Sequence, residues 1–126
     1  MEVSFLDDLR EADEYPVPHV PRHVDPLDPL ASSPADQTYQ AFRTRVERAT
    51  GFILDTSPES NVLVVAHGGS LGIMIRLLLG APAALISTDN CALHRLSWRP
   101  AGADARLGGR WIVHYLNRRT HLDRER

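Results

Sequence analysis

The stretch 62–72, VLVVAHGGSLG, combines a run of apolar residues with a histidine, two glycines and a serine. A residue at the carboxyl end of a buried strand, followed by glycines and a helix, lies where open α/β sheets bind their ligands. The glycines let the backbone approach an anion closely, and the amide groups at the start of the helix attract phosphate or carboxylate. His67 would add a hydrogen-bond donor to such a site. Position alone leaves a second interpretation equally open, in which His67 bonds a neighbouring carbonyl and the glycines serve only the turn.

The elements around this stretch alternate between strand and helix. Residues 61–66 have the pattern of a strand buried on both faces, as in a parallel sheet. After a glycine turn, residues 70–79 are predicted to form a helix that ends at Gly80. Two further strands are predicted over 91–99 and 111–116. Helices flanking a buried strand indicate an α/β fold with a layered sheet.

The first half of the chain holds a short predicted strand over 2–6 and a long predicted loop. Six of the nine prolines lie between Pro16 and Pro34, and proline removes amide donors, so 16–34 is predicted to be a proline-rich loop. A helix follows, capped by Ser32 or Ser33 and ended by the sequence DTSPES. Its apolar residues recur at helical spacing and form one stripe, made of Tyr39, Phe42, Val46, Ala49 and Ile53.

Composition limits the class of protein. With 126 residues, 43% of them hydrophobic and 24% charged, the chain has the make-up of a single soluble globular domain over 1–126. A net charge of −2 gives no indication of a nucleic-acid or membrane partner. The single cysteine, Cys91, excludes an internal disulfide and suits a reducing compartment, and the acidic start carries no targeting signal. These features predict a cytoplasmic protein.

Five segments, taken in order, resemble the histidine phosphatase superfamily, whose fold is called phosphoglycerate mutase-like. VLVVAHGGSLGIMIRLLLG is similar to that family's second catalytic-histidine motif, and LREAD (9–13) is similar to its acid segment. The Arg45–Val46 pair lies in the helix that precedes the histidine strand in the family. NCALHRLSW (90–98) and YLNRRTHL (115–122) resemble its later strand and its closing segment.

The resemblance implies a phosphomonoester hydrolase, or less favourably a phosphoryl mutase, that works through a phosphohistidine and needs no cofactor. A first histidine attacks the phosphorus, while arginines and a second histidine hold the equatorial oxygens. A glutamate protonates the leaving alkoxide. Carried over to this sequence, His67 matches the second histidine, Glu11 matches the acid, and Gly68 provides a backbone contact to phosphate. The implied partner is a phosphorylated small molecule or phosphate.

Two family features have no counterpart here. The family begins with a strand ending in Arg-His-Gly, which supplies the nucleophile, but the one Arg-His pair, Arg22–His23, precedes a valine and follows Glu11. The chain therefore resembles the carboxyl-terminal part of the family's domain, without its first strand, and we expect impaired catalysis. The sequence after Glu11, which lies in the acidic run DDLREADE, also departs from the family pattern. A merely solvated charge therefore remains an alternative for Glu11.

Absence of the first strand has a physical consequence for residues 61–66. In the family that strand lies beside the histidine strand, so its loss leaves amides, carbonyls and apolar side chains without a neighbour. Residues 61–66 could then pair with 91–99, pair with another chain, or leave the protein poorly folded. We expect marginal stability, or a homo-oligomer formed through the exposed sheet edge.

Two other functions fit parts of the sequence. GGSLG fits the G-x-S-x-G elbow of α/β-hydrolases, so Ser70 could be a nucleophile, with Asp89 and a later histidine completing a triad. A non-catalytic remnant that binds a phosphorylated ligand or a protein would share the fold and lack the chemistry. No group of residues has metal-ligand spacing. His94 and His114 are interpreted as ordinary strand histidines.

Overall fold

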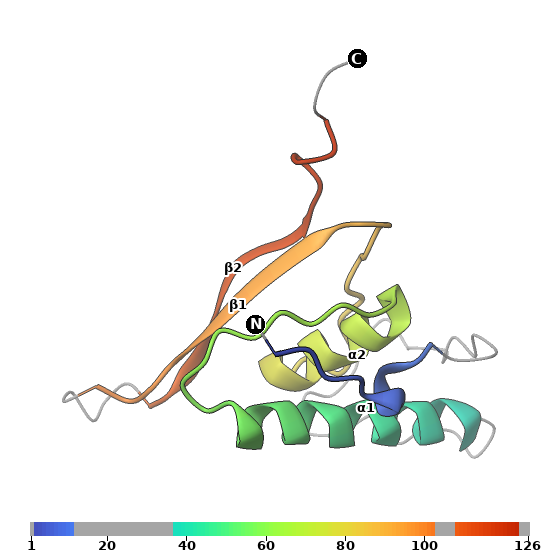
Figure 1. The fold of residues 1–126 in the computed structure, drawn as a ribbon, viewed down its shortest axis with the longest axis horizontal. Coiled ribbons are helices and arrows are strands. Elements are labelled where there is room, and N and C mark those ends of the chain that lie inside the picture. Colours follow the sequence, from blue (N-terminus) through green and yellow to red (C-terminus); the bar gives the residue numbers. More distant parts are fainter. Residues whose placement is uncertain (1, 12–36, 103–107, 124–126) are drawn as a thin grey trace. The chain divides into compact units, whose positions relative to one another are not determined.

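The computed structural model describes residues 2–11, 37–102 and 108–123, and they belong to two compact units, residues 1–85 and 86–126. The first unit holds the 3₁₀ turn η1 (Asp7–Leu9) and the helices α1 (Gln37–Thr56) and α2 (Gly68–Leu79). The second holds the strands β1 (Leu93–Arg99) and β2 (Arg110–Arg118) (Figure 1). The chain thus mixes helices with a small antiparallel sheet. The predicted 16–34 loop and the Ser32 or Ser33 cap lie outside the described residues, and a single domain over 1–126 stays a prediction.

Helices α1 and α2 form because each carries apolar residues at helical spacing, and they bury these against each other. The predicted stripe of α1 is confirmed, since Val46 is fully buried and Phe42 and Ala49 are nearly so. From α2, Ile73 and Met74 join Phe42 and Val46 in one cluster. Burial of apolar side chains contributes about 1.5–3 kcal/mol each, so this cluster is the main stabilising feature of the first unit.

The ends of α2 follow the sequence closely. The helix begins at Gly68, so the two glycines form its first turn, whereas the sequence predicted a turn before Ser70. Gly80 ends the helix in the left-handed conformation, with φ of 60°. The amides of Gly80 and Ala81 donate to Leu77 O and Arg76 O, which satisfies two of the carbonyls that a helix end leaves without partners.

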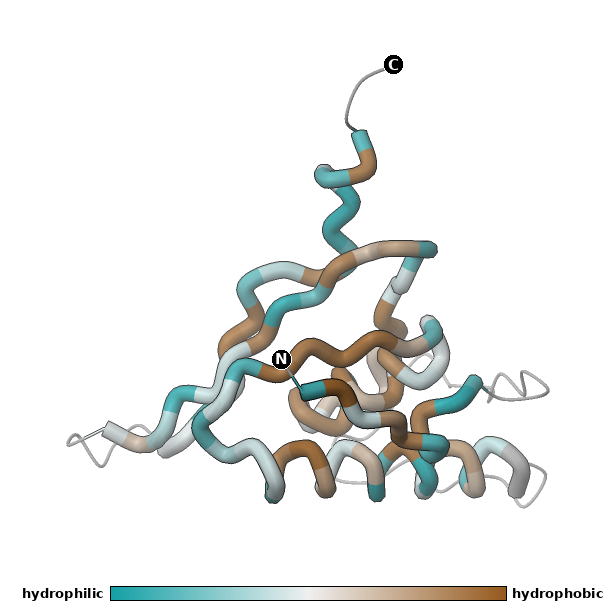
Figure 2. The backbone as a smooth tube through the Cα atoms, viewed as in Figure 1, coloured by the Kyte–Doolittle hydropathy of each residue, from teal (hydrophilic) through white to brown (hydrophobic). Residues whose placement is uncertain are grey.

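The predicted strands over 61–66 and 2–6 are wrong. Residues 61–66 lie extended before α2, but their backbone groups make no hydrogen bond with any described residue. Val64 packs on the core cluster, while Leu63 and Val65 are 76% and 86% exposed. Figure 2 shows this extended segment as a continuous hydrophobic stretch. The apolar pattern of residues 61–66 is typical of a strand. A strand also needs a hydrogen-bonded neighbour, and none of the described residues provides one.

The second unit is an antiparallel hairpin, and both of its strands were predicted. Trp98 pairs with Trp111 across the strands, with ring centroids 5.6 Å apart, and the register shifts on either side of Arg95. Within the described residues the sheet consists of β1 and β2. No described residue of this unit is fully buried. A hairpin of this kind is marginally stable by itself.

Candidate functional site

His67 is the residue immediately before α2, and its side chain is available to a ligand. Its backbone is extended, with φ of −88° and ψ of 164°, and the residue is exposed. The imidazole makes no hydrogen bond with any described residue. The interpretation in which His67 serves a neighbouring carbonyl is therefore not supported. An exposed imidazole beside a helix N-terminus is suited to donate to an anion.

Glu11 lies against the first turn of the same helix. Its Oε2 accepts a hydrogen bond from the Gly69 amide at 3.2 Å, and the residue is half-buried. A carboxylate is stabilised there by the N–H groups and positive end of the helix. Gly69 allows this approach because a Cβ at that position would lie 2.5 Å from Glu11 Oε1. Glu11 is thus not the freely solvated charge that the acidic run DDLREADE left open.

The Ser70 hydroxyl makes a hydrogen bond inside the fold and is not placed to act as a nucleophile. The residue is fully buried, and its hydroxyl donates to Leu9 O at 2.8 Å and lies 3.3 Å from Arg10 O. A nucleophilic serine needs a base beside it and access to the substrate. The hydrolase interpretation of Ser70 is therefore wrong, and the serine instead fixes the segment that leads to Glu11.

Arg45 reaches from α1 to the same segment. Its Nη1 donates to Arg10 O at 2.9 Å and to Asp7 O and Asp8 O at 3.3 Å each. Its guanidinium carbon lies 5.0 Å from the centroid of the Phe42 ring, which steadies the side chain. Sequence reasoning singled out Arg45 only as part of a resemblance and gave it no role.

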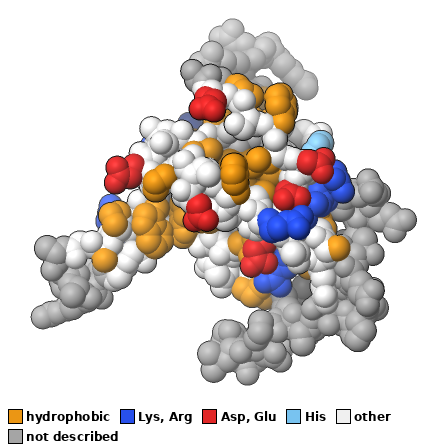
Figure 3. Space-filling model, turned by 60° about the horizontal axis from the view of Figure 1, so that its bottom comes forward, with side chains coloured by type: hydrophobic (Ala, Val, Ile, Leu, Met, Phe, Trp, Pro, Cys, Tyr) orange, Lys and Arg blue, Asp and Glu red, His pale blue; other side chains and the backbone are white. Residues whose placement is uncertain are grey.

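Around η1 the charges occur as pairs. Arg48 bonds Asp8 at 3.0 Å, and Arg10 bonds Asp7 within the turn. Figure 3 shows basic and acidic side chains adjoining one another on one face, beside hydrophobic ones. Exposed pairs of this kind contribute at most about 1 kcal/mol each. Their effect is to leave little net charge around η1.

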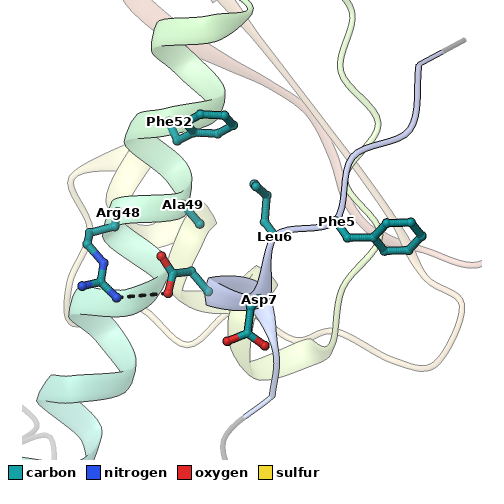
Figure 4. Close-up of a pocket in the computed structure, with 7 residues that line it drawn as sticks. Phe5, Leu6, Asp7, Arg48, Ala49 and Phe52 are labelled. Carbon is teal, nitrogen blue, oxygen red and sulfur yellow. Dashed lines mark hydrogen bonds and ion pairs between the residues drawn. The ribbon is translucent and has the colours of Figure 1, made fainter.

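A separate cavity of about 450 Å³ lies between the amino-terminal segment and α1. Ala49, Phe52 and Leu6 line it, and the Arg48–Asp8 pair lies at one side (Figure 4). Phe5 points away from α1 in that view and is 95% exposed. His67 and Glu11 do not line this cavity, so it is distinct from the site at α2.

The second unit contains a hydrogen-bond cluster built from the segments that resemble the family's strand and closing motif. Asn117 has a positive φ of 50°, and its side chain bonds the Asp89 amide at 2.8 Å and the Asp89 carboxylate at 3.0 Å. Its own amide donates to His94 Nδ1 at 3.3 Å, and Thr88 Oγ1 lies 3.3 Å from Nε2. Burial lowers the pKa of His94. His94 and His114 both lie on strands, and His114 bonds Ser97 Oγ.

Metal-binding side chains are not clustered in the described part of the chain, where no group of three or more His, Cys, Asp or Glu could hold an ion. None of the described helices is long and apolar enough to cross a lipid bilayer. Cys91 is exposed and unpaired.

Comparison with other proteins shows the family to which the chain belongs. The sequence profile of the histidine phosphatase superfamily (branch 1) matches residues 5–108, which include Glu11, Arg45 and His67. The chain therefore belongs to the histidine phosphatase superfamily. It is 29% identical over 93 residues to "Probable phosphoglycerate mutase GpmB" of Cronobacter sakazakii, covering 71% of this chain and 42% of that protein. The protein of the same name from Salmonella paratyphi B is 28% identical over the same length and the same shares of the two chains.

The match thus spans less than half the length of these curated relatives. No solved structure matches the chain significantly.

Proposed function

We propose that the chain takes part in phosphomonoester hydrolysis through a site at the start of α2, with His67 and Glu11 as its catalytic residues. The observation that carries this proposal is the hydrogen bond between the Glu11 carboxylate and the Gly69 amide, two residues after the exposed His67. Residues 58 positions apart in the sequence are brought to one helix end. Membership of the histidine phosphatase superfamily supports the same assignment.

In this proposal the substrate's phosphoryl oxygens bind at the N-terminus of α2. The amide of Gly68 and the His67 imidazole donate to those oxygens, where negative charge accumulates in the transition state. Glu11, once protonated, gives its proton to the leaving alkoxide. A positioned general acid contributes roughly 10²–10⁴-fold to such a step. Hydrolysis is favoured over transfer to a second hydroxyl, and the substrate is a phosphorylated small molecule.

The nucleophile is the missing part. An Arg-His-Gly sequence does not occur in these 126 residues. We propose that they correspond to the carboxyl-terminal part of a phosphoglycerate mutase-like layered domain, and that the chain alone turns over substrate slowly. The 42% share of the relatives that the match covers is consistent with this. A single, exposed cysteine also suits a reducing compartment, in keeping with a cytoplasmic protein.

The test measures binding and turnover separately on the 126-residue chain. Inorganic phosphate is titrated while the His67 ring protons are followed by NMR, and p-nitrophenyl phosphate turnover is assayed in parallel. We expect a saturable shift at His67, accompanied by a shift of the Gly68 amide that His67→Ala weakens, and little turnover. His121→Ala is the matched control, because His121 is exposed and makes no hydrogen bond with a described residue. Absence of any phosphate-dependent shift at His67 would refute the proposal.

A second candidate, a non-catalytic domain that binds a phosphorylated ligand, is favoured by one observation. His67 is free to donate to an anion, while the sequence holds no Arg-His-Gly nucleophile. Phosphate binding with no detectable turnover of p-nitrophenyl phosphate would favour this candidate. Turnover that His67→Ala abolishes would exclude it.

We also propose that residues 61–66 pair with the same segment of a second copy, forming a homo-oligomer. The support is a run of six uncharged residues whose backbone makes no hydrogen bond with a described residue, and in which Leu63 and Val65 are largely exposed. Unpaired strand edges of this composition are templates for pairing with another chain. Identical neutral segments carry no like charges that would oppose such pairing.

A further inference from the structure

Side chains from α1 and α2 hold the backbone of Leu9 and Arg10, the two residues directly before Glu11. On one side, the Arg45 guanidinium of α1 donates to Arg10 O, with Asp7 O and Asp8 O sharing its Nη1 hydrogens. Asp7 O also accepts from the Arg10 amide, whereas Asp8 O and Arg10 O lie at the end of η1, where a helical turn leaves acceptors without backbone partners. All three bonds come from Nη1, which lies one covalent bond further along the side chain than the nitrogen of a lysine would, so arginine reaches these carbonyls and lysine falls short.

On the other side, the Ser70 hydroxyl of α2 donates to Leu9 O at 2.8 Å. Ser70 is fully buried, so this bond is shielded from water and the hydroxyl has no alternative solvent partner. The carbonyls of two consecutive residues, Leu9 and Arg10, are therefore each held by a side chain from a different helix. Glu11 is the next residue in the chain.

We propose that Arg45 and Ser70 are positioning residues that set the place of the Glu11 carboxylate against the N-terminus of α2. With the Leu9 and Arg10 carbonyls held, the backbone at Glu11 has little freedom, and its carboxylate meets the Gly69 amide at 3.2 Å. Loss of either side chain frees the segment and lets the carboxylate leave the helix. This inference rests on the proposed function for its catalytic meaning, but the contact that it explains can be measured without any activity.

The contribution of Arg45 is distinct from general stabilisation of the fold. A merely structural Arg45 would lower the stability of the whole first unit and leave the Glu11–Gly69 contact intact in every folded molecule. A positioning Arg45 changes that contact within molecules that are still folded. Neither Arg45→Gln nor Ser70→Ala removes an apolar side chain from the core cluster of Phe42, Val46, Ile73 and Met74, so both variants keep the contacts between α1 and α2.

The experiment is a double-mutant cycle read by the chemical shift of the Gly69 amide proton in the full 126-residue chain. In the parent protein, Glu11→Ala removes the carboxylate and shifts this resonance upfield. We expect that shift to be largely lost in Arg45→Gln and in Ser70→Ala, because Glu11 no longer contacts the amide there. Arg43→Gln is the matched control, since Arg43 lies on the same helix, carries the same charge and makes no hydrogen bond or ion pair with a described residue. It should retain the full shift.

Arg45→Lys keeps the proposal testable if Arg45→Gln gives no folded spectrum. Lysine keeps the charge but its nitrogen lies one covalent bond short of the Nη1 position, so the Glu11-dependent shift should be reduced there and preserved in Arg43→Lys. An undiminished shift in Arg45→Lys and Ser70→Ala would overturn the positioning role. The readout is separate from that of the proposed function, because failure of phosphate to move the His67 resonances leaves the Gly69 result unaffected.

Discussion

A methyl group at Gly69 tests the contact between Glu11 and α2 directly. A Cβ at this position would lie 2.5 Å from Glu11 Oε1 and 3.2 Å from both Oε2 and Cδ. Ordinary van der Waals separation begins near 3.4 Å, so the carboxylate must retreat by about 1 Å. The obstacle is the free end of a flexible side chain, and Gly69 lies in a regular helix. We therefore expect Gly69→Ala to fold normally and to displace Glu11.

The free energy of unfolding should change little. A hydrogen bond to a charged group contributes about 1.5–3 kcal/mol, and the half-buried carboxylate regains water when it leaves, so the loss is about 1 kcal/mol. Alanine in place of glycine stabilises a helix by up to about 1 kcal/mol, which offsets that loss. The informative quantity is the coupling between the two sites. Glu11→Ala should cost about 1 kcal/mol in the parent protein and almost nothing in Gly69→Ala.

Urea denaturation of the four proteins of this cycle measures the coupling. Gly51→Ala is the control, because Gly51 lies in α1 and a Cβ there meets no atom within 4 Å. It should stabilise the protein by about 0.5–1 kcal/mol and leave the cost of Glu11→Ala unchanged. Equal costs of Glu11→Ala in the Gly69→Ala and parent backgrounds would refute the contact on which the proposed site depends.

Three further perturbations test other parts of the molecule. Burial holds the pKa of His94 below its usual 6.5, so the unfolded chain binds the proton more readily than the folded one. The stability that this difference contributes should be full above about pH 6.5 and fall as the pH drops toward the folded pKa. Thermal denaturation across pH should show this fall in the parent protein and its loss in His94→Gln. Gly80→Ala should lower the free energy of unfolding by about 1–2 kcal/mol, because φ is 60° there. No atom lies within 4 Å of the new Cβ, so the backbone conformation alone causes this loss. An unchanged midpoint in urea denaturation would contradict the helix end described above. The double variant Leu63→Lys and Val65→Lys places like charges along the unpaired segment and should convert the proposed oligomer to monomer in sedimentation, whereas Phe52→Lys, an exposed hydrophobic on α1, should not.

The two helices and the hairpin could be predicted because their signals are local. The stripe through Phe42 and Val46 fixes which face of α1 is buried, and Gly80 marks the end of α2 whatever surrounds it. The prediction of a strand over residues 61–66 was wrong because a strand depends on a neighbour that is distant in the sequence. A strand is defined by its partner, and the apolar pattern of the segment carries no information on whether one is present.

The candidate site divides in the same way. His67 was singled out by its place between an apolar run and a glycine-led helix, and Glu11 by its resemblance to an acid segment, and their roles stay predictions. The contacts of Arg45 were not predictable, because they join α1 to carbonyls at least 35 residues earlier in the chain. An arginine beside the stripe residue Val46 is ordinary in an amphipathic helix, and nothing in its spacing identifies backbone carbonyls as its partners. Ser70 was misread because G-x-S-x-G describes the sequence around a serine and not its burial.

His67 lies between α2, whose backbone is hydrogen-bonded, and residues 61–66, whose backbone makes no hydrogen bond with a described residue. From Gly68 onward the backbone is fixed by α2, and Leu71 donates back to His67 O at 2.9 Å. Before it, the backbone of residues 61–66 makes no hydrogen bond with any described residue, so among these residues the histidine is constrained from one side only. Pairing of that segment with a second copy would constrain the other side and lower the entropy that His67 loses when it binds phosphate. Because such coupling is reciprocal, phosphate should also tighten the pairing. Sedimentation with and without inorganic phosphate decides this: an association constant that phosphate leaves unchanged would mean that the site and the segment act independently.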